Sequence, residues 1–145
     1  MISYSPEDTM MFAGKLASKA GSGDVICLCG QLGAGKTAFA KGFAIGLGIK
    51  EHVNSPTFTL VQIYNNGRLP LYHFDLYRLT EFEDTVQIDP DTLEDIGFFE
   101  YMNADGVCLI EWAEYARNFI PDGATWVEIK ISENFRIIKV KRGDI

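Results

Sequence analysis

The residues best suited to chemistry form one glycine-rich run, Gly30-Gln31-Leu32-Gly33-Ala34-Gly35-Lys36-Thr37. This run fits the pattern G-x-x-x-x-G-K-[ST] at every position. Glycines let backbone N–H groups point at phosphate oxygens, and a following helix presents its N-terminus to the same charge. Lys36 would contact the β- and γ-phosphates of a nucleoside triphosphate, and Thr37 would offer its hydroxyl to Mg²⁺. The run therefore predicts a phosphate-binding loop; an ordinary glycine-rich turn is the alternative.

An acidic residue at the end of a second apolar run is the next candidate. Residues 107–110 have the pattern of a buried strand, and Glu111 follows them directly. Proteins with a phosphate loop hold Mg²⁺ with a second acid of this kind, so Glu111 is expected near the metal. An ordinary strand end that carries an acid is the alternative. Trp112 either forms a wall of the nucleotide site or covers the end of the strand.

A third β-rich run carries His73, Asp75 and Tyr77 at alternate positions, which places all three on one face of a strand. A carboxylate on a buried face costs free energy unless a partner compensates its charge. A hydrated Mg²⁺ or an attacking water would compensate it, and Asp75 would then orient that water. The alternative is an edge strand whose polar face is solvated.

The tripeptide Ser55-Pro56-Thr57 lies a little over one helix length after the phosphate loop. Many phosphate-loop enzymes place a switch segment there, which becomes ordered against the γ-phosphate. An ordinary turn into the following strand explains the tripeptide equally well, so both interpretations stay open.

The phosphate loop needs a strand before it and a helix after it, and the sequence predicts both. Val25–Cys29 is a short apolar strand, and apolar spacing predicts a helix over residues 36–47. An earlier helix is expected to begin at Ser5-Pro6-Glu7-Asp8, which combines a serine cap, a proline in the first turn and an acid three residues after the cap. Lys36 and Thr37 are thereby placed in the first turn of a helix.

The rest of the chain alternates between β-rich and helical runs. Two hairpins are predicted, one over residues 57–64 and 69–77 with Asn-Gly in its turn, and one over 126–131 and 135–140. Short helices are expected over residues 81–86, 91–102 and 113–119. The simplest architecture is an α/β fold with a mainly parallel sheet, flanking helices and added antiparallel hairpins.

The length and the charge of the chain limit the classes of protein to which it can belong. The chain has 145 residues, 47% hydrophobic and 23% charged, which predicts one globular domain over residues 1–145. A net charge of −7 excludes tight, non-specific nucleic-acid binding by the whole surface. Charge is unevenly distributed, with eight acids over residues 81–100 and a basic C-terminal segment. Both segments are either solvated faces or docking surfaces. The basic residues are Lys130, Arg136, Lys139, Lys141 and Arg142.

Cysteine usage indicates a reducing compartment. Cys27, Cys29 and Cys108 lie in apolar runs, where a reduced cysteine behaves as a small hydrophobic residue. Two distant histidines add too few ligands for a structural metal site, and none is expected. No run approaches the length of a membrane span. These observations predict a cytoplasmic protein without a membrane partner.

Four motifs in a fixed order resemble one protein family. They are Leu-Gly-Ala-Gly-Lys-Thr at 32–37, Asn-Ser-Pro-Thr-Phe-Thr-Leu at 54–60, Tyr-His-Phe-Asp-Leu-Tyr-Arg-Leu at 72–79 and Ile-Glu-Trp at 110–112. Together they resemble the TsaE family, the small bacterial ATPases of tRNA threonylcarbamoyladenosine biosynthesis. The resemblance extends from the N-terminal helix start to about residue 121.

The resemblance implies an α/β fold of the P-loop NTPase type that binds ATP or ADP with Mg²⁺ and hydrolyses ATP slowly by itself. It also implies association with the TsaB–TsaD pair, which places threonylcarbamate on the adenosine next to the tRNA anticodon. In that family the nucleotide cycle resets the TsaB–TsaD pair between turnovers. The ATPase contacts tRNA indirectly, through the complex.

The resemblance also assigns roles to individual residues. Thr37 and Glu111 correspond to the residues that bind the metal ion. Lys36, Asp75 and Glu111 correspond to the catalytic residues of ATP hydrolysis. Thr9 would lie near the adenine. The implied nucleotide-binding residues are Thr9, Gly33, Ala34, Gly35, Lys36, Thr37, Ala38, Thr57 and Trp112.

The sequence departs from the family pattern at three positions. Gln31 stands where many members have Asp, Ala38 where a second hydroxyl residue is common, and Ala113 where Pro is frequent. None of these changes removes an expected phosphate or metal ligand. Gln31 can change hydrogen bonding around the loop. The resemblance therefore supports nucleotide binding by this chain more strongly than it supports the family's rate of hydrolysis.

Three other functions are compatible with a phosphate loop. A small-molecule kinase usually needs a closing lid with arginines, and only Arg68, Arg78 and Arg117 lie in the body of the chain. A GTPase would need the guanine-reading Asn/Thr-Lys-x-Asp pattern, which the chain lacks. A nucleotide-gated binding module with incidental hydrolysis is compatible with every motif.

Overall fold

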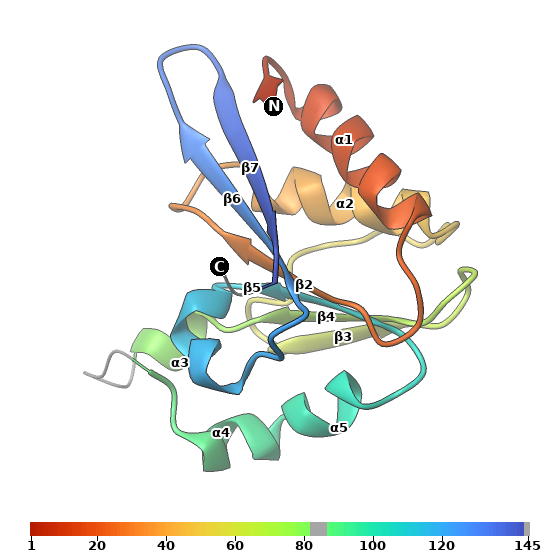
Figure 1. Ribbon diagram of the computed structural model, residues 1–145, viewed down its shortest axis with the longest axis vertical. Coiled ribbons are helices and arrows are strands. Elements are labelled where there is room, and N and C mark those ends of the chain that lie inside the picture. The colour runs from red at the N-terminus through yellow and green to blue at the C-terminus, as the bar shows by residue number, and fades with distance from the viewer. Residues whose placement is uncertain (82–86, 144–145) are drawn as a thin grey trace.

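The computed structural model describes residues 1–81 and 87–143, and within these residues a single seven-stranded sheet runs through the molecule (Figure 1). The strand order is β1-β7-β6-β2-β5-β4-β3. The four central strands, from β6 to β4, pair in parallel, whereas β1, β7 and β3 pair antiparallel at the two edges. The strands are β1 Ile2–Ser3, β2 Val25–Cys29, β3 Val61–Tyr64, β4 Leu71–Asp75, β5 Val107–Glu111, β6 Thr125–Ile131 and β7 Arg136–Arg142. This arrangement confirms the predicted α/β class with a parallel centre and two antiparallel hairpins.

Helices cover both faces of the sheet (Figure 1). On one face, α1 (Pro6–Ser18) and α2 (Lys36–Gly46) pack against each other and against the alternate strand residues that point toward them. On the other face lie α4 (Pro90–Asp95), α5 (Phe98–Met102) and the 3-10 helix η1 (Ala113–Phe119). The short helix α3 (Tyr77–Glu81) follows β4 directly. The apolar core therefore consists of two layers separated by the sheet.

Local chemistry explains the predicted start of α1. The Ser5 side chain accepts a hydrogen bond from the backbone N–H of Asp8 at 3.1 Å, and the Asp8 carboxylate accepts one from the N–H of Tyr4 at 3.0 Å. This reciprocal capping satisfies N–H groups that the helix itself cannot pair. The predictions of α1, β2, α2 and the β6–β7 hairpin are confirmed.

The prediction that a strand begins at Thr57 is wrong, because β3 begins only at Val61. Residues 57–60 form a turn in which the N–H of Leu60 donates to the carbonyl of Pro56 at 2.8 Å, and Leu60 has a positive φ of 68°. The hydroxyl of Thr57 is meanwhile bonded to Asp75. A side-chain contact with a residue distant in sequence therefore overrides the β propensity of this run.

The extension of the next strand to Tyr77 is also wrong. The strand β4 ends at Asp75, whose carboxylate accepts a hydrogen bond from the N–H of Tyr77 at 3.0 Å and thereby turns the chain into α3. The alternative of a solvated edge strand is likewise excluded, because β4 is buried throughout and lies between β3 and β5.

The helical predictions after α3 hold in part. The single helix predicted over 91–102 is two helices, α4 and α5, separated at Gly97. The helix predicted over 113–119 has 3-10 geometry. The helix predicted over 81–86 lies almost entirely outside the described residues. None of the helices in the described part of the chain has the length and hydropathy needed to span a bilayer.

Candidate nucleotide-binding site

The phosphate loop joins the end of β2 to the first turn of α2. Gly33 and Gly35 have φ values of 80° and 112°, a left-handed conformation that residues with a Cβ rarely adopt. Gly35 lies immediately before the helix, so Lys36 and Thr37 occupy its first turn, where backbone N–H groups are unpaired within the helix. An anion could be bound by the unpaired N–H groups at the start of this helix.

The side chain of Lys36 folds back over the phosphate loop that precedes it. Its ammonium donates to the backbone carbonyls of Gly30 and Gln31 and lies 3.7 Å from the ring centroid of Trp112. Burial of the ammonium lowers the pKa of Lys36 below its ordinary value, and nearby carboxylates, that of Glu111 first, partly oppose this shift. A buried cation held mainly by neutral groups is well placed to receive a phosphate.

Two carboxylates face the loop from adjacent parallel strands. Asp75 and Glu111 are paired residues at the ends of β4 and β5, and only 4% and 2% of their surfaces are exposed. The Nε2 atom of His73 lies 2.6 Å from Oε2 of Glu111, and His73 is fully buried. Strand pairing therefore brings together residues that are 36 positions apart in the sequence.

The segment before β3 supplies hydroxyl groups to both carboxylates. The Ser55 hydroxyl lies 2.9 Å from Oδ2 of Asp75 and 3.0 Å from Oε2 of Glu111, and the Thr57 hydroxyl lies 3.1 Å from the same Asp75 oxygen. A serine hydroxyl has one hydrogen, so Ser55 donates to one carboxylate at a time. These two hydroxyls are neutral donors to the carboxylates.

These groups line one cavity of about 360 Å³. Its walls include most of the residues predicted from the sequence for nucleotide, metal and catalysis, and Trp112 forms a wall rather than only covering the end of β5. Trp112 has a positive φ of 61°, and its ring packs against that of Tyr77 at 4.9 Å. The predicted residues that line the cavity are Gly33, Gly35, Lys36, Thr37, Thr57, Asp75, Glu111 and Trp112.

The remaining predicted residues lie on the other side of the loop. Thr9, Ala34 and Ala38 line a second cavity, of about 200 Å³, which shares Gly33 and Gly35 with the first. The N-terminal segment and the β6–β7 turn close this cavity, with the rings of Tyr4 and Phe135 6.1 Å apart. Thr9 is buried, and its hydroxyl lies 2.7 Å from that of Ser3.

Some residues of the site were not assigned a site role from the sequence. The hydroxyl of Ser55 and the ring of His73 contact the carboxylates, although only their motifs were noted. Glu114 lies close to Lys36, and burial raises the pKa of its carboxyl. Arg136 of β7 donates to the carbonyl of Ala34 at 3.2 Å. The folded structure is needed to reveal these contacts, because the residues lie far apart along the chain.

Comparison with known proteins identifies the family. The chain matches the family described as threonylcarbamoyl adenosine biosynthesis protein TsaE over residues 3–139. The chain belongs to the TsaE family. The match extends beyond residue 121, into the C-terminal hairpin that carries no motif of its own.

Several TsaE proteins from other bacteria are similar over most of this chain. The tRNA threonylcarbamoyladenosine biosynthesis protein TsaE of Bacillus subtilis is 48% identical over 86% of this chain and 73% of its own length. The TsaE protein of Treponema pallidum is 41% identical over 90% of each chain. The crystal structure of Bacillus subtilis YdiB superposes with a TM-score of 0.80 at 36% identity, covering 99% of this chain and 84% of that one. This TsaE family member is thus placed in tRNA threonylcarbamoyladenosine biosynthesis.

Proposed function

We propose that this TsaE family member binds ATP with Mg²⁺, hydrolyses it slowly and acts as the nucleotide-dependent component that resets the TsaB–TsaD pair. The observation that carries the proposal is the shared cavity. Lys36 and Thr37 of the phosphate loop line it together with Asp75 and Glu111, although these pairs come from distant parts of the sequence. A loop for phosphates and two acids in one cavity are the parts that phosphoryl transfer to water requires.

The residues of the cavity fit a magnesium ion. Mg²⁺ prefers oxygen ligands, and the Thr37 hydroxyl and the Glu111 carboxylate provide them. Asp75 and Glu111 are buried side by side with only hydroxyl, imidazole and backbone donors as hydrogen-bond partners among the described residues. A bound cation would compensate their charge. When bound, the ion would neutralise phosphate charge, and Thr37 and Glu111 would hold it.

Lys36 and Asp75 have different roles in the proposed hydrolysis. In the proposed hydrolysis, water attacks the γ-phosphorus, the bond to the β–γ bridging oxygen breaks, and ADP and phosphate leave. Lys36 neutralises charge that develops on the phosphate oxygens. Asp75 orients the attacking water, which requires its oxygen to exchange a hydroxyl donor, Ser55 or Thr57, for that water.

The nucleoside would occupy the second cavity. It adjoins the phosphate loop through Gly33 and Gly35, and its lining combines aromatic and polar side chains, the buried Thr9 among them. Such a pocket suits a planar base with a few polar edges. Adenine is therefore proposed to bind between the start of α1 and the turn of the β6–β7 hairpin.

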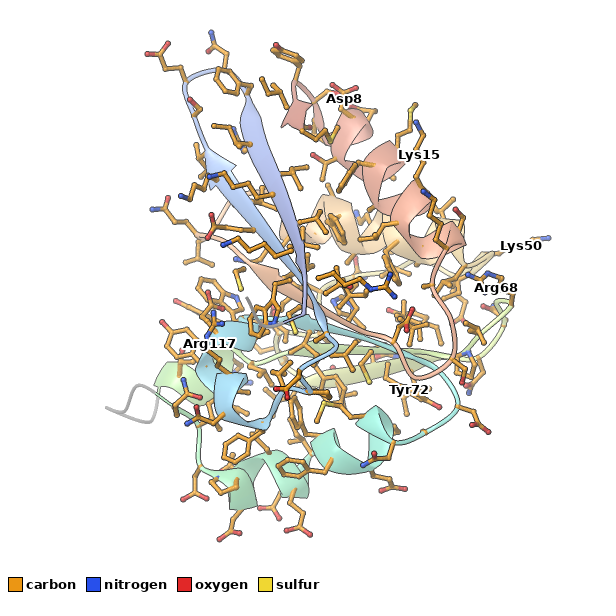
Figure 2. All side chains as sticks on the ribbon, viewed as in Figure 1. Asp8, Lys15, Lys50, Arg68, Tyr72 and Arg117 are labelled. Carbon is orange, nitrogen blue, oxygen red and sulfur yellow. The ribbon has the colours of Figure 1, made fainter. Side chains whose placement is uncertain are left out.

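The positions of Arg68, Arg78 and Arg117 do not favour a small-molecule kinase. The guanidinium of Arg68 donates to the carbonyls of Ala17 and Ala20 at 2.7 and 2.6 Å and so caps the end of α1 (Figure 2). Arg78 lies over the ring of Phe58, and Arg117 over that of Trp126. The residues that line the loop cavity include no arginine, so none of these three arginines forms a lid over that cavity.

A nucleotide-gated binding module remains the second candidate, and Asp75 separates it from an ATPase. Asp75→Asn keeps the size of the side chain and should retain ATP binding within a few-fold. Hydrolysis should fall by a factor on the order of 10²–10³, as expected for loss of a group that acts on the attacking water. A variant that no longer hydrolyses ATP yet still resets the TsaB–TsaD pair at the normal rate would favour the binding module.

Titration calorimetry with ATP and Mg²⁺ tests the proposal directly. The wild-type chain should bind ATP more tightly with Mg²⁺ than without it, and should prefer ATP to GTP. Lys36→Ala should weaken binding at least on the order of tenfold, because a charge-assisted contact to phosphate is lost. Lys41→Ala, on the same helix but outside both cavities, is the matched control. Equal ATP affinity for wild type and Lys36→Ala would refute the proposal.

A further inference from the structure

The outer face of the β6–β7 hairpin carries a basic cavity that the nucleotide site does not use. The cavity measures about 380 Å³, and its lining residue Trp126 packs on the core layer away from α1 and α2. Four cations line it, Arg117 from η1, Lys130 from β6, and Lys139 and Lys141 from β7. Strand pairing places Lys141 opposite Trp126 and Lys139 opposite Glu128.

Most of these cations form no ion pair in the described part of the chain, although Glu128 also lines the cavity. Lys130 forms an ion pair with Glu128 at 3.3 Å. Within residues 1–81 and 87–143, Arg117, Lys139 and Lys141 form no salt bridge. Like charges this close repel one another, and this cluster occurs in a chain with a net charge of −7. The cluster therefore favours a polyanionic ligand.

An aromatic side chain lies among the cations. The guanidinium of Arg117 lies 4.2 Å from the ring centroid of Trp126, and both residues line the cavity. Flat aromatic rings and guanidinium planes are the surfaces on which unpaired nucleic-acid bases stack. Cations that follow a groove beside such a platform contact the phosphate backbone. An acidic protein segment would use the lysines but has no need of the stacking surface.

We propose that this face, formed by Arg117, Trp126, Lys130, Lys139 and Lys141, binds the backbone of a single-stranded RNA segment. RNA is the polyanion of choice because the family acts in a tRNA modification, and single-stranded loops are the RNA elements that proteins read by stacking. The proposal rests on this charged face and on the family, and does not depend on nucleotide hydrolysis.

The RNA face adjoins the phosphate loop. Cys29, the last residue of β2, lines the basic cavity and directly precedes Gly30, the first residue of the loop. Figure 2 shows Arg117 on the opposite side of the molecule from Lys15 and Lys50, two exposed lysines of the described chain. The molecule thus provides its own control for general electrostatic attraction.

Fluorescence anisotropy of a labelled oligouridine RNA with the full chain tests the proposal at low salt. The double variant Lys139→Ala/Lys141→Ala should raise Kd on the order of tenfold. It should also lower the slope of log K against log salt by about 0.7 for each lysine removed. The double variant Lys15→Ala/Lys50→Ala should leave both quantities close to those of the wild type. All four lysines are exposed, so thermal unfolding should confirm intact folds.

Three results would overturn the proposal. The first is equal RNA affinity for the two double variants. The second is loss of RNA binding in Lys36→Ala, which would place the RNA on the phosphate loop. The third is competition by polyglutamate as efficient as that by unlabelled RNA of equal charge, which would indicate an acidic protein partner. Because Lys139→Ala/Lys141→Ala should still bind ATP, failure of this proposal is distinguishable from failure of the proposed function.

Discussion

At the scale of single residues, the site depends on how its carboxylates are held. His73 is fully buried and lies 2.6 Å from Glu111, while its Nδ1 has no hydrogen-bond partner among the described atoms. A carboxylate only accepts hydrogen bonds, so the ring donates through Nε2 and fixes one oxygen of Glu111. Groups that orient a metal-binding side chain in this way tune its affinity for the metal.

Replacing His73 with Phe therefore tests the metal side of the proposed site. The variant keeps a ring but leaves the buried Glu111 without one donor, which should lower the free energy of unfolding by about 1–3 kcal/mol. The Mg²⁺ concentration that half-saturates the effect of Mg²⁺ on ATP binding should rise roughly 10–100-fold. His52→Phe, at an exposed position, is the control. An unchanged Mg²⁺ titration in His73→Phe would show that His73 does not position Glu111.

The cysteines give a second prediction at this scale. Burial raises the pKa of Cys29 and of Cys108 to about 12, from an ordinary value of 9.0, and raises that of Cys27 further. Only the thiolate reacts, so at about pH 8 the thiols of the native protein should react with a disulfide reagent on the order of a thousandfold more slowly than those of the urea-unfolded chain. The rate should rise with pH. Rapid labelling of the native protein would contradict these pKa shifts.

At the scale of elements, the sequence predicts those helices, strands and turns whose positions are determined by residues close together in the chain. The phosphate loop and the capped start of α1 each follow from neighbouring residues. The loop between β3 and β4 is in addition tied to the end of α2, since the N–H of Arg68 donates to the carbonyl of Leu47 at 2.8 Å. The turn at 57–60 depends on a distant residue, because the hydroxyl of Thr57 is bonded to Asp75. The end of β4 is a local turn, in which the N–H of Tyr77 donates to the carboxylate of Asp75, and the β-rich pattern of this run concealed it. Candidate residues could thus be chosen from the sequence, whereas their grouping into two cavities required the sheet.

The contact between α1 and α2 yields a prediction about stability. A Cβ added to Gly42 on α2 would lie 2.2 Å from the backbone oxygen of Met10 on α1. Since backbone atoms on both helices would have to move, Gly42→Ala should destabilise the protein by about 1–3 kcal/mol in urea unfolding. A Cβ at Gly21 would meet nothing within 4 Å, so Gly21→Ala should stay within about 0.5 kcal/mol of the wild type. Equal stability of both variants would contradict the close packing of the two helices.

At the scale of the whole molecule, the phosphate loop lies at a junction. The cavity with Asp75 and Glu111 lies on one side of it, the proposed adenine pocket on another, and the basic face begins at Cys29 just before it. Among the described residues that line the loop cavity, Lys36 is the only cation, and no arginine is present. The proposed function therefore predicts slow hydrolysis by the chain alone, because arginine contacts contribute strongly to the rates of phosphate-loop enzymes.

The central claim is an ATPase that depends on its partners, and ATP hydrolysis is the measurement that tests it most directly. Phosphate release should be followed with the purified chain alone and with the TsaB–TsaD pair, using Lys36→Ala as the control. The proposal predicts low activity alone, higher activity with the pair and loss of both in the variant. High activity alone that ignores the pair, or activity that survives Lys36→Ala, would contradict it.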